Sequence, residues 1–405
     1  MAATYVELAN LLLFRFVGAS MSFSLNSCRI ALAALGVLAL VPSFARVASA
    51  APKGEPVVVG AILSMTGPYA PLGEPESRSL KIAEADINAH GGIGGRPLQI
   101  TIEDDEGKAD TAAQLATSLI GKHVAMIIGG SLTPTSAAIA RVTNEAKVLQ
   151  IFMTPTQQLW NTKAGILKYL FEATPRNELE AAKLLNYAKT TLKAKKIAVM
   201  HDDAPYGTQG ALVVAAEAKN ADVTIVDDEP FPINASDVTA QLGKVKASGA
   251  DTVFIWTASP VAPLAVRQIR QLGMNINVVG STGIVSDNFL RIAGKDGEGV
   301  LADMDLNVTH PNAPQRKFLT AYRAAYNTRP NNFASFAWDA AHLAALALTE
   351  AKGKYDGDSL AAALLRMKPY GGSTGTYKYT DTDHNGMRAD DIHMAVDRHQ
   401  VWFTL

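Results

Sequence analysis

Short apolar runs alternate with amphipathic segments along most of this chain. The run from Val57 to Leu63 has the continuous apolar character of a strand that is buried on both faces. A helical pattern at 79–89, a Gly-rich turn at 91–95 and a second strand at 98–103 follow it. The further predicted elements of this first block are helices at 110–121 and 135–146 and strands at 125–128 and 148–153. Strands and helices in alternation predict a parallel sheet with helices on both faces.

A longer amphipathic helix, predicted at 174–194, leads into a second block of the same kind. This block has predicted strands at 196–200, 223–227, 252–256 and 277–280 and helices near 208–220, 237–248 and 261–272. Three helical patterns and two aromatic-rich strands come after it. We therefore predict an α/β protein with residues 51–172 plus 308–378 in lobe 1 and residues 173–307 plus 379–405 in lobe 2. A chain of 405 residues also exceeds the size at which one core usually suffices.

The first fifty residues, 1–50, are predicted to be an upstream extension and a signal peptide. From Met21, Arg29 precedes an apolar run at 30–41, and Ala48, Ser49 and Ala50 come before the mature chain. This order of charged, apolar and small residues predicts cleavage after Ala50 and export to the periplasm. The apolar run is short for a membrane span, so a retained anchor is the weaker interpretation.

Two details of this segment bear on the mature protein. Residues 1–20 lie upstream of the signal pattern, so the choice between Met1 and Met21 as the translation start is left open. Cys28 is the only cysteine, and it lies before the apolar run instead of after it. We therefore predict neither a disulfide nor a lipid anchor in the mature protein.

Composition narrows the class of protein. With 48% hydrophobic and 19% charged residues the chain can bury a large core. The net charge is −1 and no run of Lys or Arg occurs, so no nucleic-acid partner is predicted. After the signal segment no apolar stretch is long enough to cross a bilayer, so no stable membrane insertion is predicted.

Several motifs that would indicate an enzyme, a cofactor or a metal are misplaced or incomplete in this chain. The glycines at 91–95 follow a helix and precede a strand, which is the reverse of a dinucleotide-binding turn. Residues 381–386 resemble the start of a calcium loop, but Ile392 stands where a bidentate Glu is needed. G-x-S-x-G occurs at 371–375, but it follows a predicted helix and precedes a predicted strand, the reverse of a nucleophile elbow, and H-E-x-x-H does not occur. An acid–base role for the paired carboxylates 104–105 and 202–203 stays open, although loop solvation is the better interpretation. We predict no cofactor, no metal and no enzymatic activity.

Loops at the ends of the predicted strands are rich in Ser, Thr and Gly. They lie at 64–73, 129–136 and 154–158. Ligands bind at the carboxyl ends of strands in open parallel sheets, where helix N-termini and hydroxyls suit a carboxylate or another polar head group. Ordinary helix capping is the alternative for any single Ser or Thr.

A series of motifs resembles the leucine/isoleucine/valine-binding protein family, the type I periplasmic substrate-binding proteins of ABC transporters. The motifs are TGPYA at 66–70, INAHGGIGGR at 87–96, EDD at 103–105, HDDAPYG at 201–207 and RQIRQLG at 267–273. The resemblance implies two Rossmann-like lobes with parallel central sheets, joined by a multi-strand hinge, and a small-molecule solute held in the cleft. It also implies delivery of the solute to permease and ATPase subunits of the transporter, by a binding protein expected to be a monomer.

The resemblance also implies positions for the ligand. The predicted ligand-binding residues are Leu72, Ser131, Thr133, Thr156 and Gln158 in the first lobe and Tyr206, Ser259 and Thr282 in the second. Thr133 would hold a ligand carboxylate through its hydroxyl and N–H, and Leu72 would contact the ligand side chain. Tyr206, Ser259 and Thr282 would close over the ligand from the second lobe.

This chain departs from the family at three of these positions. Thr282 replaces the acidic residue that pairs with a ligand ammonium, Ser259 replaces an aromatic residue, and Gln158 replaces a threonine. Burying an ammonium without a carboxylate partner costs on the order of several kcal/mol. We therefore expect a ligand other than a standard α-amino acid, such as an aromatic or other hydrophobic carboxylate or an amide.

The predicted function is solute binding by hinge closure for an importer of the branched-chain amino acid type. One alternative keeps the fold and makes the chain a periplasmic solute sensor. Another is an exported α/β enzyme, such as a hydrolase or a dehydrogenase.

Overall fold

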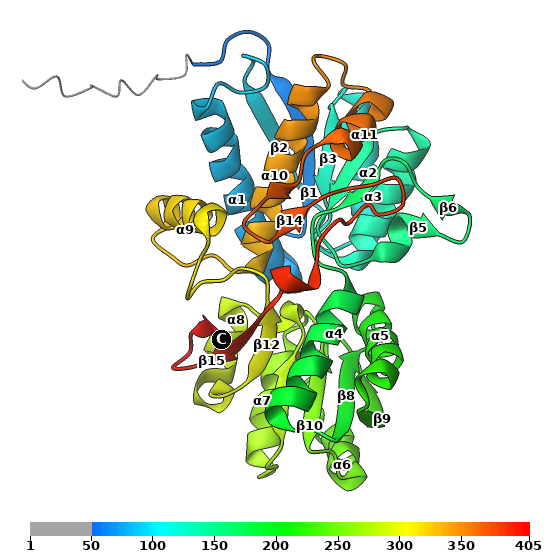
Figure 1. Cartoon of the computed structure of the whole chain (residues 1–405), viewed down its shortest axis with the longest axis vertical. Coiled ribbons are helices and arrows are strands. Elements are labelled where there is room, and N and C mark those ends of the chain that lie inside the picture. Colours follow the sequence, from blue (N-terminus) through cyan, green and yellow to red (C-terminus); the bar gives the residue numbers. More distant parts are fainter. Residues whose placement is uncertain (1–50) are drawn as a thin grey trace, which may run out of the picture. The chain divides into compact units, whose positions relative to one another are not determined.

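Two large sheets organise residues 51–405, the part of the chain that the computed structural model describes (Figure 1). The first sheet has the strand order β2-β1-β3-β4-β7 and is parallel throughout. The second has the order β16-β15-β12-β11-β10-β8-β9. It is parallel from β9 to β12, and β15 and β16 join antiparallel at one edge. The predicted α/β fold with two parallel central sheets is confirmed. The predicted cleavage after Ala50 lies outside the described residues.

The first sheet and the helices packed on it form what we call the first lobe. Its strands are β1 (Val57–Leu63), β2 (Leu98–Asp104), β3 (Met126–Gly129), β4 (Leu149–Phe152) and β7 (Leu170–Glu172). The helices are α1 (Ala70–Ala89), α2 (Ala109–Gly121), α3 (Thr133–Glu145), α9 (Ala313–Tyr326), α10 (Asn332–Glu350) and α11 (Gly357–Arg366). Figure 1 shows α10, in orange, alongside α1, in blue, although the two are far apart in the sequence.

The second sheet and its helices form the second lobe. Its strands are β8 (Lys196–Asp202), β9 (Thr224–Phe231), β10 (Thr252–Trp256), β11 (Asn277–Gly280), β12 (Leu301–Met304), β15 (His393–Asp397) and β16 (Trp402–Thr404). The helices are α4 (Asn177–Tyr187), α5 (Pro205–Ala221), α6 (Thr239–Ser248), α7 (Val261–Gln271) and α8 (Asp287–Ala293). The exact limits of the two lobes along the chain stay a prediction.

Short elements complete the chain. Two hairpins are formed by β5 (Asn161–Thr162) with β6 (Gly165–Ile166) and by β13 (Tyr370–Gly371) with β14 (Thr376–Tyr377). The 3-10 turns are η1 (Gly67–Tyr69), η2 (Gln157–Leu159), η4 (Thr282–Ile284), η5 (Gly294–Gly297) and η6 (Ala389–Asp391), and a π-helical turn, η3 (Ala188–Leu192), extends α4. Within residues 51–405 no helix combines the length and the apolar character of a membrane span.

The two faces of β1 explain its continuous apolar sequence. Val59 and Leu63 pack toward α1 and α10, whereas Ile62 packs with Leu119 of α2 and Ile139 of α3 on the other face. All five side chains are buried. A strand covered by helices on both faces needs apolar residues at every position, because successive side chains point to opposite sides.

Helix α1 begins at Ala70, nine residues before the start of the predicted helical pattern at 79. Pro71 lies in its first turn, where a missing N–H is tolerated. Gly73 lies so close to β1 that an added Cβ would be 2.2 Å from the carbonyl oxygen of Ser64. These residues interrupt the apolar periodicity, so the pattern reveals only the second half of the helix.

Three segments connect the lobes: 173–176 before α4, 305–312 after β12, and 378–392 before β15. The first and third are joined by hydrogen bonds at the end of β7. The Tyr377 hydroxyl donates to the carbonyl of Ala173 (3.1 Å), and the Tyr379 hydroxyl donates to the carbonyl of Glu172 (3.0 Å). Asn385 of the third segment also donates to the carbonyl of Thr174 in the first, so these two segments are hydrogen-bonded to each other.

Candidate ligand-binding site

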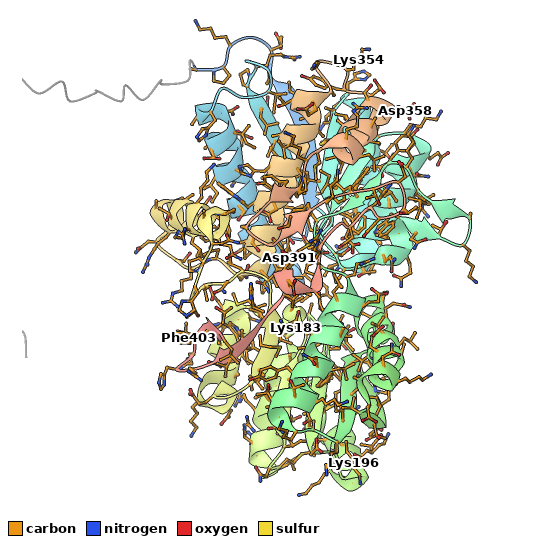
Figure 2. All side chains as sticks on the ribbon, viewed as in Figure 1. Lys183, Lys196, Lys354, Asp358, Asp391 and Phe403 are labelled. Atoms are coloured by element: carbon orange, nitrogen blue, oxygen red, sulfur yellow. The ribbon has the colours of Figure 1, made fainter. Side chains whose placement is uncertain are left out.

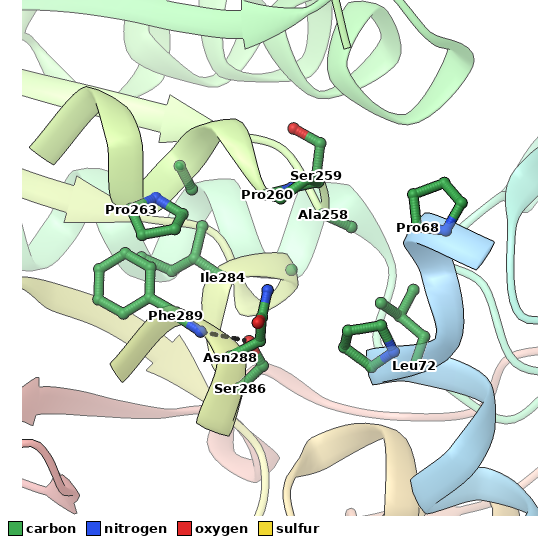
Figure 3. A pocket seen from close by; sticks show the side chains of 13 residues that line it. Pro68, Leu72, Ala258, Ser259, Pro260, Pro263, Ile284, Ser286, Asn288 and Phe289 are labelled. Atoms are coloured by element: carbon green, nitrogen blue, oxygen red, sulfur yellow. Dashed lines mark hydrogen bonds between the residues drawn. The ribbon is translucent and has the colours of Figure 1, made fainter. Parts of the chain in front are cut away.

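A cavity of about 400 Å³ is lined by residues from both lobes. Its lining residues are Leu72, Ser131, Leu132, Thr133, Met153, Thr154, Pro155, Phe333 and Phe336 of the first lobe and Tyr206, Ala258, Thr282 and Gly283 of the second. A neighbouring cavity of about 340 Å³ shares Leu72, Ala258 and Gly283 with it. We call the two together the pocket. Figure 3 shows the smaller of the two cavities, with Pro68 and Leu72 on one side and Ser259, Ile284 and Phe289 on the other.

The pocket lies where loops leave the carboxyl ends of β1, β3, β4, β10 and β11. Two glycines allow these loops to approach closely. A Cβ on Gly129 would lie 2.2 Å from the Ile62 carbonyl oxygen, and one on Gly283 would lie 2.5 Å from the Thr257 carbonyl oxygen. The Gly283 Cβ would also come within 2.9 Å of the Tyr206 ring, so this glycine lets Tyr206 and the loop of Thr282 share one wall.

Thr133 combines a hydroxyl with the N-terminus of α3, of which it is the first residue. Its Oγ1 lies 3.1 Å from Oγ1 of Thr156. Thr154 donates its hydroxyl proton to Ser136 (3.0 Å), which in turn donates to the carbonyl of Gly130 (3.2 Å). When Thr156 donates to Thr133, the Thr133 proton is free to bind a solute. A helix N-terminus beside this donor favours a negatively charged group.

Ser131 lines the pocket, but its hydroxyl is engaged inside the first lobe. Its Oγ donates to the buried carboxyl group of Glu76 and accepts from the backbone N–H of Ser64 at 3.0 Å. Burial raises the pKa of Glu76 well above its ordinary value. The hydroxyl of Ser131 therefore positions the loop, and its proton is not available to a solute.

The remaining two predicted first-lobe positions lie outside the pocket lining. Thr156 is buried behind Thr133, and its backbone N–H donates to the carboxyl group of Glu172 at 2.8 Å. Trp160 donates its indole N–H to the same carboxyl group at 2.9 Å. Gln158 is exposed in η2, so the structure does not bring it to the pocket.

On the second-lobe wall, Tyr206 lies in the first turn of α5, with its ring centroid 6.1 Å from that of Trp256. Its buried hydroxyl has no hydrogen-bond partner among the described residues. Thr282 accepts a hydrogen bond of 2.6 Å from Nδ2 of Asn332, the first residue of α10. Ser259 lies at the edge of the pocket, where its Oγ is 2.8 Å from Oγ1 of Thr257.

Three carboxyl groups, those of Glu180, Asp303 and Asp305, are buried near this wall. Within residues 51–405 none of their six carboxyl oxygens makes a hydrogen bond. Burial raises the pKa of Asp303 to about 8 and the pKa values of Glu180 and Asp305 well above the ordinary range. Burial therefore favours the uncharged form of each of these carboxyl groups.

Two further groups act on these carboxyl groups: Lys183 lowers the pKa of Asp303, and Asp391 raises the pKa of Asp305. Figure 2 shows Lys183 on α4 of the second lobe and Asp391 of η6 between the two lobes. Burial, reinforced by Lys183, lowers the pKa of His393 at the start of β15. In the described part of the chain, no group of three or more His, Cys, Asp or Glu residues is arranged to hold a metal ion.

Every side chain that lines the pocket is uncharged. Leu72, Met153, Phe333 and Phe336 supply apolar surface, and hydroxyl groups lie on both lobes. Phe333, Phe336 and Asn332 could not be predicted as parts of the site, because their helical spacing is that of an ordinary core helix. Five of the predicted residues, Leu72, Ser131, Thr133, Tyr206 and Thr282, line the larger cavity together.

Two lobes with a pocket between them at their strand ends define a class of binding proteins. Residues 56–396 match the family model described as "Periplasmic binding protein", so the chain belongs to this family. The predicted resemblance to the leucine/isoleucine/valine-binding proteins is confirmed. The Leu/Ile/Val-binding protein homolog 3 of Brucella melitensis is 26% identical over 88% of this chain and 96% of its own length. The Leu/Ile/Val-binding protein of Escherichia coli is 25% identical over 62% of this chain and 68% of its own length.

Solved structures agree with this assignment. The branched-chain amino acid transporter substrate-binding protein LivJ of Streptococcus pneumoniae, in complex with isoleucine, has a TM-score of 0.76 at 25% identity and covers 87% of this chain and 99% of its own. A solute-binding protein of an ABC transporter from R. palustris, in complex with benzoate, also has a TM-score of 0.76, at 20% identity, over 87% of this chain and 96% of its own. The latter similarity shows the shared fold.

Proposed function

We propose that this chain is the periplasmic solute-binding component of an ABC importer, and that its solute is a small carboxylate with an apolar body instead of an α-amino acid. One observation carries the proposal: no charged side chain lines the pocket, whereas Thr133 and the N-terminus of α3 face it. Aromatic or other hydrophobic carboxylates fit this combination, since apolar side chains make up most of the wall.

The charges of an α-amino acid fit this pocket poorly. Its carboxylate would find the helix N-terminus and the Thr133 hydroxyl, which suit a negative charge. Its ammonium would find hydroxyl groups at Thr282 and Tyr206 but no carboxylate in the lining. Removing an ammonium from water without an ionised partner costs on the order of several kcal/mol. Relatives with this fold include structures with isoleucine and with benzoate, so the fold accommodates both kinds of solute.

Binding would proceed by closure of the two lobes about the three connecting segments. The solute first contacts the loops after β3 and β4, and the loops of Ser259 and Thr282 then cover it. Permease and ATPase subunits would recognise the closed form, and no covalent bond is made or broken. In this proposal the mature protein begins at Ala51, acts in the periplasm and is a monomer.

Calorimetric titration of residues 51–405 tests the proposal. Benzoate and phenylacetate serve as carboxylates, leucine and isoleucine as α-amino acids, and benzamide and benzylamine as uncharged and cationic analogues. We expect heat of binding and a raised melting temperature with the carboxylates, because a ligand that binds only the folded state stabilises it by mass action. Tight binding of leucine without binding of any simple carboxylate would refute the choice of solute.

A further inference from the structure

The side chain of Asn332 makes two hydrogen bonds that fix its orientation. It is fully buried at the first position of α10. Its Oδ1 accepts from the backbone N–H of Leu306 in the second connecting segment, at 3.3 Å, and its Nδ2 donates to Oγ1 of Thr282 at 2.6 Å. A backbone N–H can only donate, so the oxygen of the amide must face Leu306 and the nitrogen must face Thr282.

This orientation determines what the Thr282 hydroxyl presents to the pocket. A hydroxyl has one proton and two acceptor lone pairs, and Asn332 occupies one lone pair. Among the hydrogen bonds of residues 51–405, none uses the Thr282 hydroxyl proton. Because Thr282 lines the pocket, its proton is available to a solute.

Tyr206 adds a second donor to the same wall. Its hydroxyl is buried and makes no hydrogen bond of ordinary geometry within the described chain, although the Ser281 hydroxyl lies near enough to offset part of the rise in its pKa. Burial, followed by the nearby carboxyl group of Glu180, raises the pKa of Tyr206 well above its ordinary value, so the phenol stays protonated. Gly283, the residue after Thr282, lies so close to the Tyr206 ring that an added Cβ would be 2.9 Å from it. The wall therefore offers two uncharged O–H donors.

We propose that Asn332 is a positioning residue that makes Thr282 a hydrogen-bond donor, and that the solute consequently carries an uncharged acceptor, such as a carbonyl oxygen, at the end opposite its carboxylate. The inference rests on the proposed function and names the second recognition element of the same pocket. A buried donor that finds no acceptor loses its hydrogen bonds to water, which penalises any solute with an apolar group at this end.

An amine at this end of the solute is the competing possibility. Glu180, Asp303 and Asp305 lie buried and unpartnered in this region, and an ammonium group would be compensated if one of them ionised. Thr282 and Tyr206, however, are the residues that line the pocket, whereas none of the three carboxyl groups does. The first contact of the solute is therefore with O–H donors.

Pairs of probes with the same shape test the acceptor. The first pair is 4-acetylbenzoate and 4-isopropylbenzoate, which differ by a carbonyl oxygen in place of a methyl group. The second pair is the aliphatic 4-oxopentanoate and 4-methylpentanoate, which differ in the same way and are smaller. We expect the ketone of each pair that binds to bind about tenfold more tightly, the effect of one hydrogen bond between uncharged groups. The cationic probe 4-(aminomethyl)benzoate should bind more weakly than the ketones.

Two variants test the roles of Thr282 and Asn332. Thr282→Val removes the donor and should reduce the preference for the ketone to about twofold or less, while the affinity for its apolar partner stays the same or rises. Asn332→Leu keeps the volume of the side chain but removes the amide that holds the Thr282 oxygen as an acceptor, so the hydroxyl is free to turn and the preference should fall. A loss of stability alone would weaken both members of a pair equally. The control is Thr349→Val, at an exposed position near the end of α10, which should keep the tenfold preference.

The possible results separate the need for an uncharged acceptor from the proposed carboxylate solute. Equal affinities for both members of a pair in the unchanged protein would overturn the need for an acceptor and leave the proposed carboxylate solute intact. Absence of binding by all four carboxylates would overturn the proposed function as well. Tighter binding of 4-(aminomethyl)benzoate than of the ketones would show that the buried carboxyl groups, and not the O–H donors, recognise this end of the solute. A ketone preference that survives in both Thr282→Val and Asn332→Leu would show that these residues do not create it.

Discussion

The carboxyl group of Glu172 accepts a hydrogen bond of 2.8 Å from the backbone N–H of Thr156. This bond connects the end of β7 to the loop behind Thr133. The same carboxyl group accepts from the indole of Trp160, and the backbone carbonyl of Glu172 accepts from Tyr379 of the third connecting segment. One buried residue thus contacts both the loop that supports the pocket and the connection between the lobes.

This position of Glu172 predicts a pH dependence of stability. Burial raises its pKa to about 8 from an ordinary value of 4.5. Between pH 4.5 and 8 the folded protein therefore keeps a proton that the unfolded chain has lost, so the free energy of unfolding falls as the pH rises. One group contributes up to about 1.4 kcal/mol per pH unit. Chemical denaturation at several values from pH 5 to pH 8 would measure the slope.

Glu172→Gln should make this slope shallower. At pH 5 the variant should be less stable by about 1–2 kcal/mol, because the amide cannot accept from both Thr156 and Trp160. The deficit should shrink toward pH 8, where the native carboxyl group becomes costly to ionise. Glu350→Gln at the exposed end of α10 is the control. A change of slope in the control as large as that in Glu172→Gln would contradict the assignment.

The hydroxyls of Thr133 and Ser131 should respond differently to removal. Thr133→Val should weaken carboxylate binding about tenfold or more, since hydrogen bonds to charged groups contribute roughly 1.5–3 kcal/mol. Ser131→Ala should instead lower the free energy of unfolding by about 1–3 kcal/mol, because Glu76 loses its buried donor. Calorimetry and thermal denaturation of both variants separate the two effects. Equal losses of affinity would show that Ser131 also contacts the solute.

Gly283 should tolerate no side chain. In Gly283→Ala the Cβ would meet the Thr257 carbonyl oxygen at 2.5 Å and the Tyr206 ring at 2.9 Å, so the second-lobe wall must shift. We expect solute affinity to fall at least tenfold. Gly243→Ala in α6 is the matched control, because its Cβ has no neighbour within 4 Å and alanine favours a helix. Unchanged affinity in Gly283→Ala would show that the wall adapts.

Gln158 provides a test of the limits of the pocket. Gln158 was predicted to contact the ligand, but its side chain is exposed in η2. We expect Gln158→Ala to change the solute dissociation constant by less than about twofold, within the range of ordinary surface substitutions. A tenfold loss would mean that closure of the lobes carries η2 to the solute. Titration of the variant beside Thr133→Val gives the comparison.

The sequence alone predicts the alternation of strands and helices because each strand must be apolar on both faces, as in β1. The sequence does not predict the start of α1. Pro71 in the first turn and Gly73 against the Ser64 carbonyl interrupt the helical spacing of apolar residues there. The strand-end rule and the family resemblance together direct attention to Thr133 and Tyr206, which the structure places along one cavity. Whether these residues bind a solute stays a prediction.

Other residues of the site leave no local signal in the sequence. Asn332 is 50 positions from its partner Thr282, and its apolar neighbours make it resemble the start of an ordinary core helix. Glu172 directly follows a buried strand, where its contacts with Thr156 and Trp160 depend on the path of an intervening loop. Such roles are set by tertiary contacts, which periodicity does not encode.

The triple connection between the lobes also restricts how they can move. Sliding or twisting one lobe against the other would stretch at least one of the segments 173–176, 305–312 and 378–392, and the hydrogen bonds from Tyr377 and Tyr379 oppose their separation. Bending is then the motion of lowest cost, so the open and closed forms differ mainly in one angle. A single pair of fluorescent labels, one on each lobe, would for that reason convert solute occupancy directly into an optical signal.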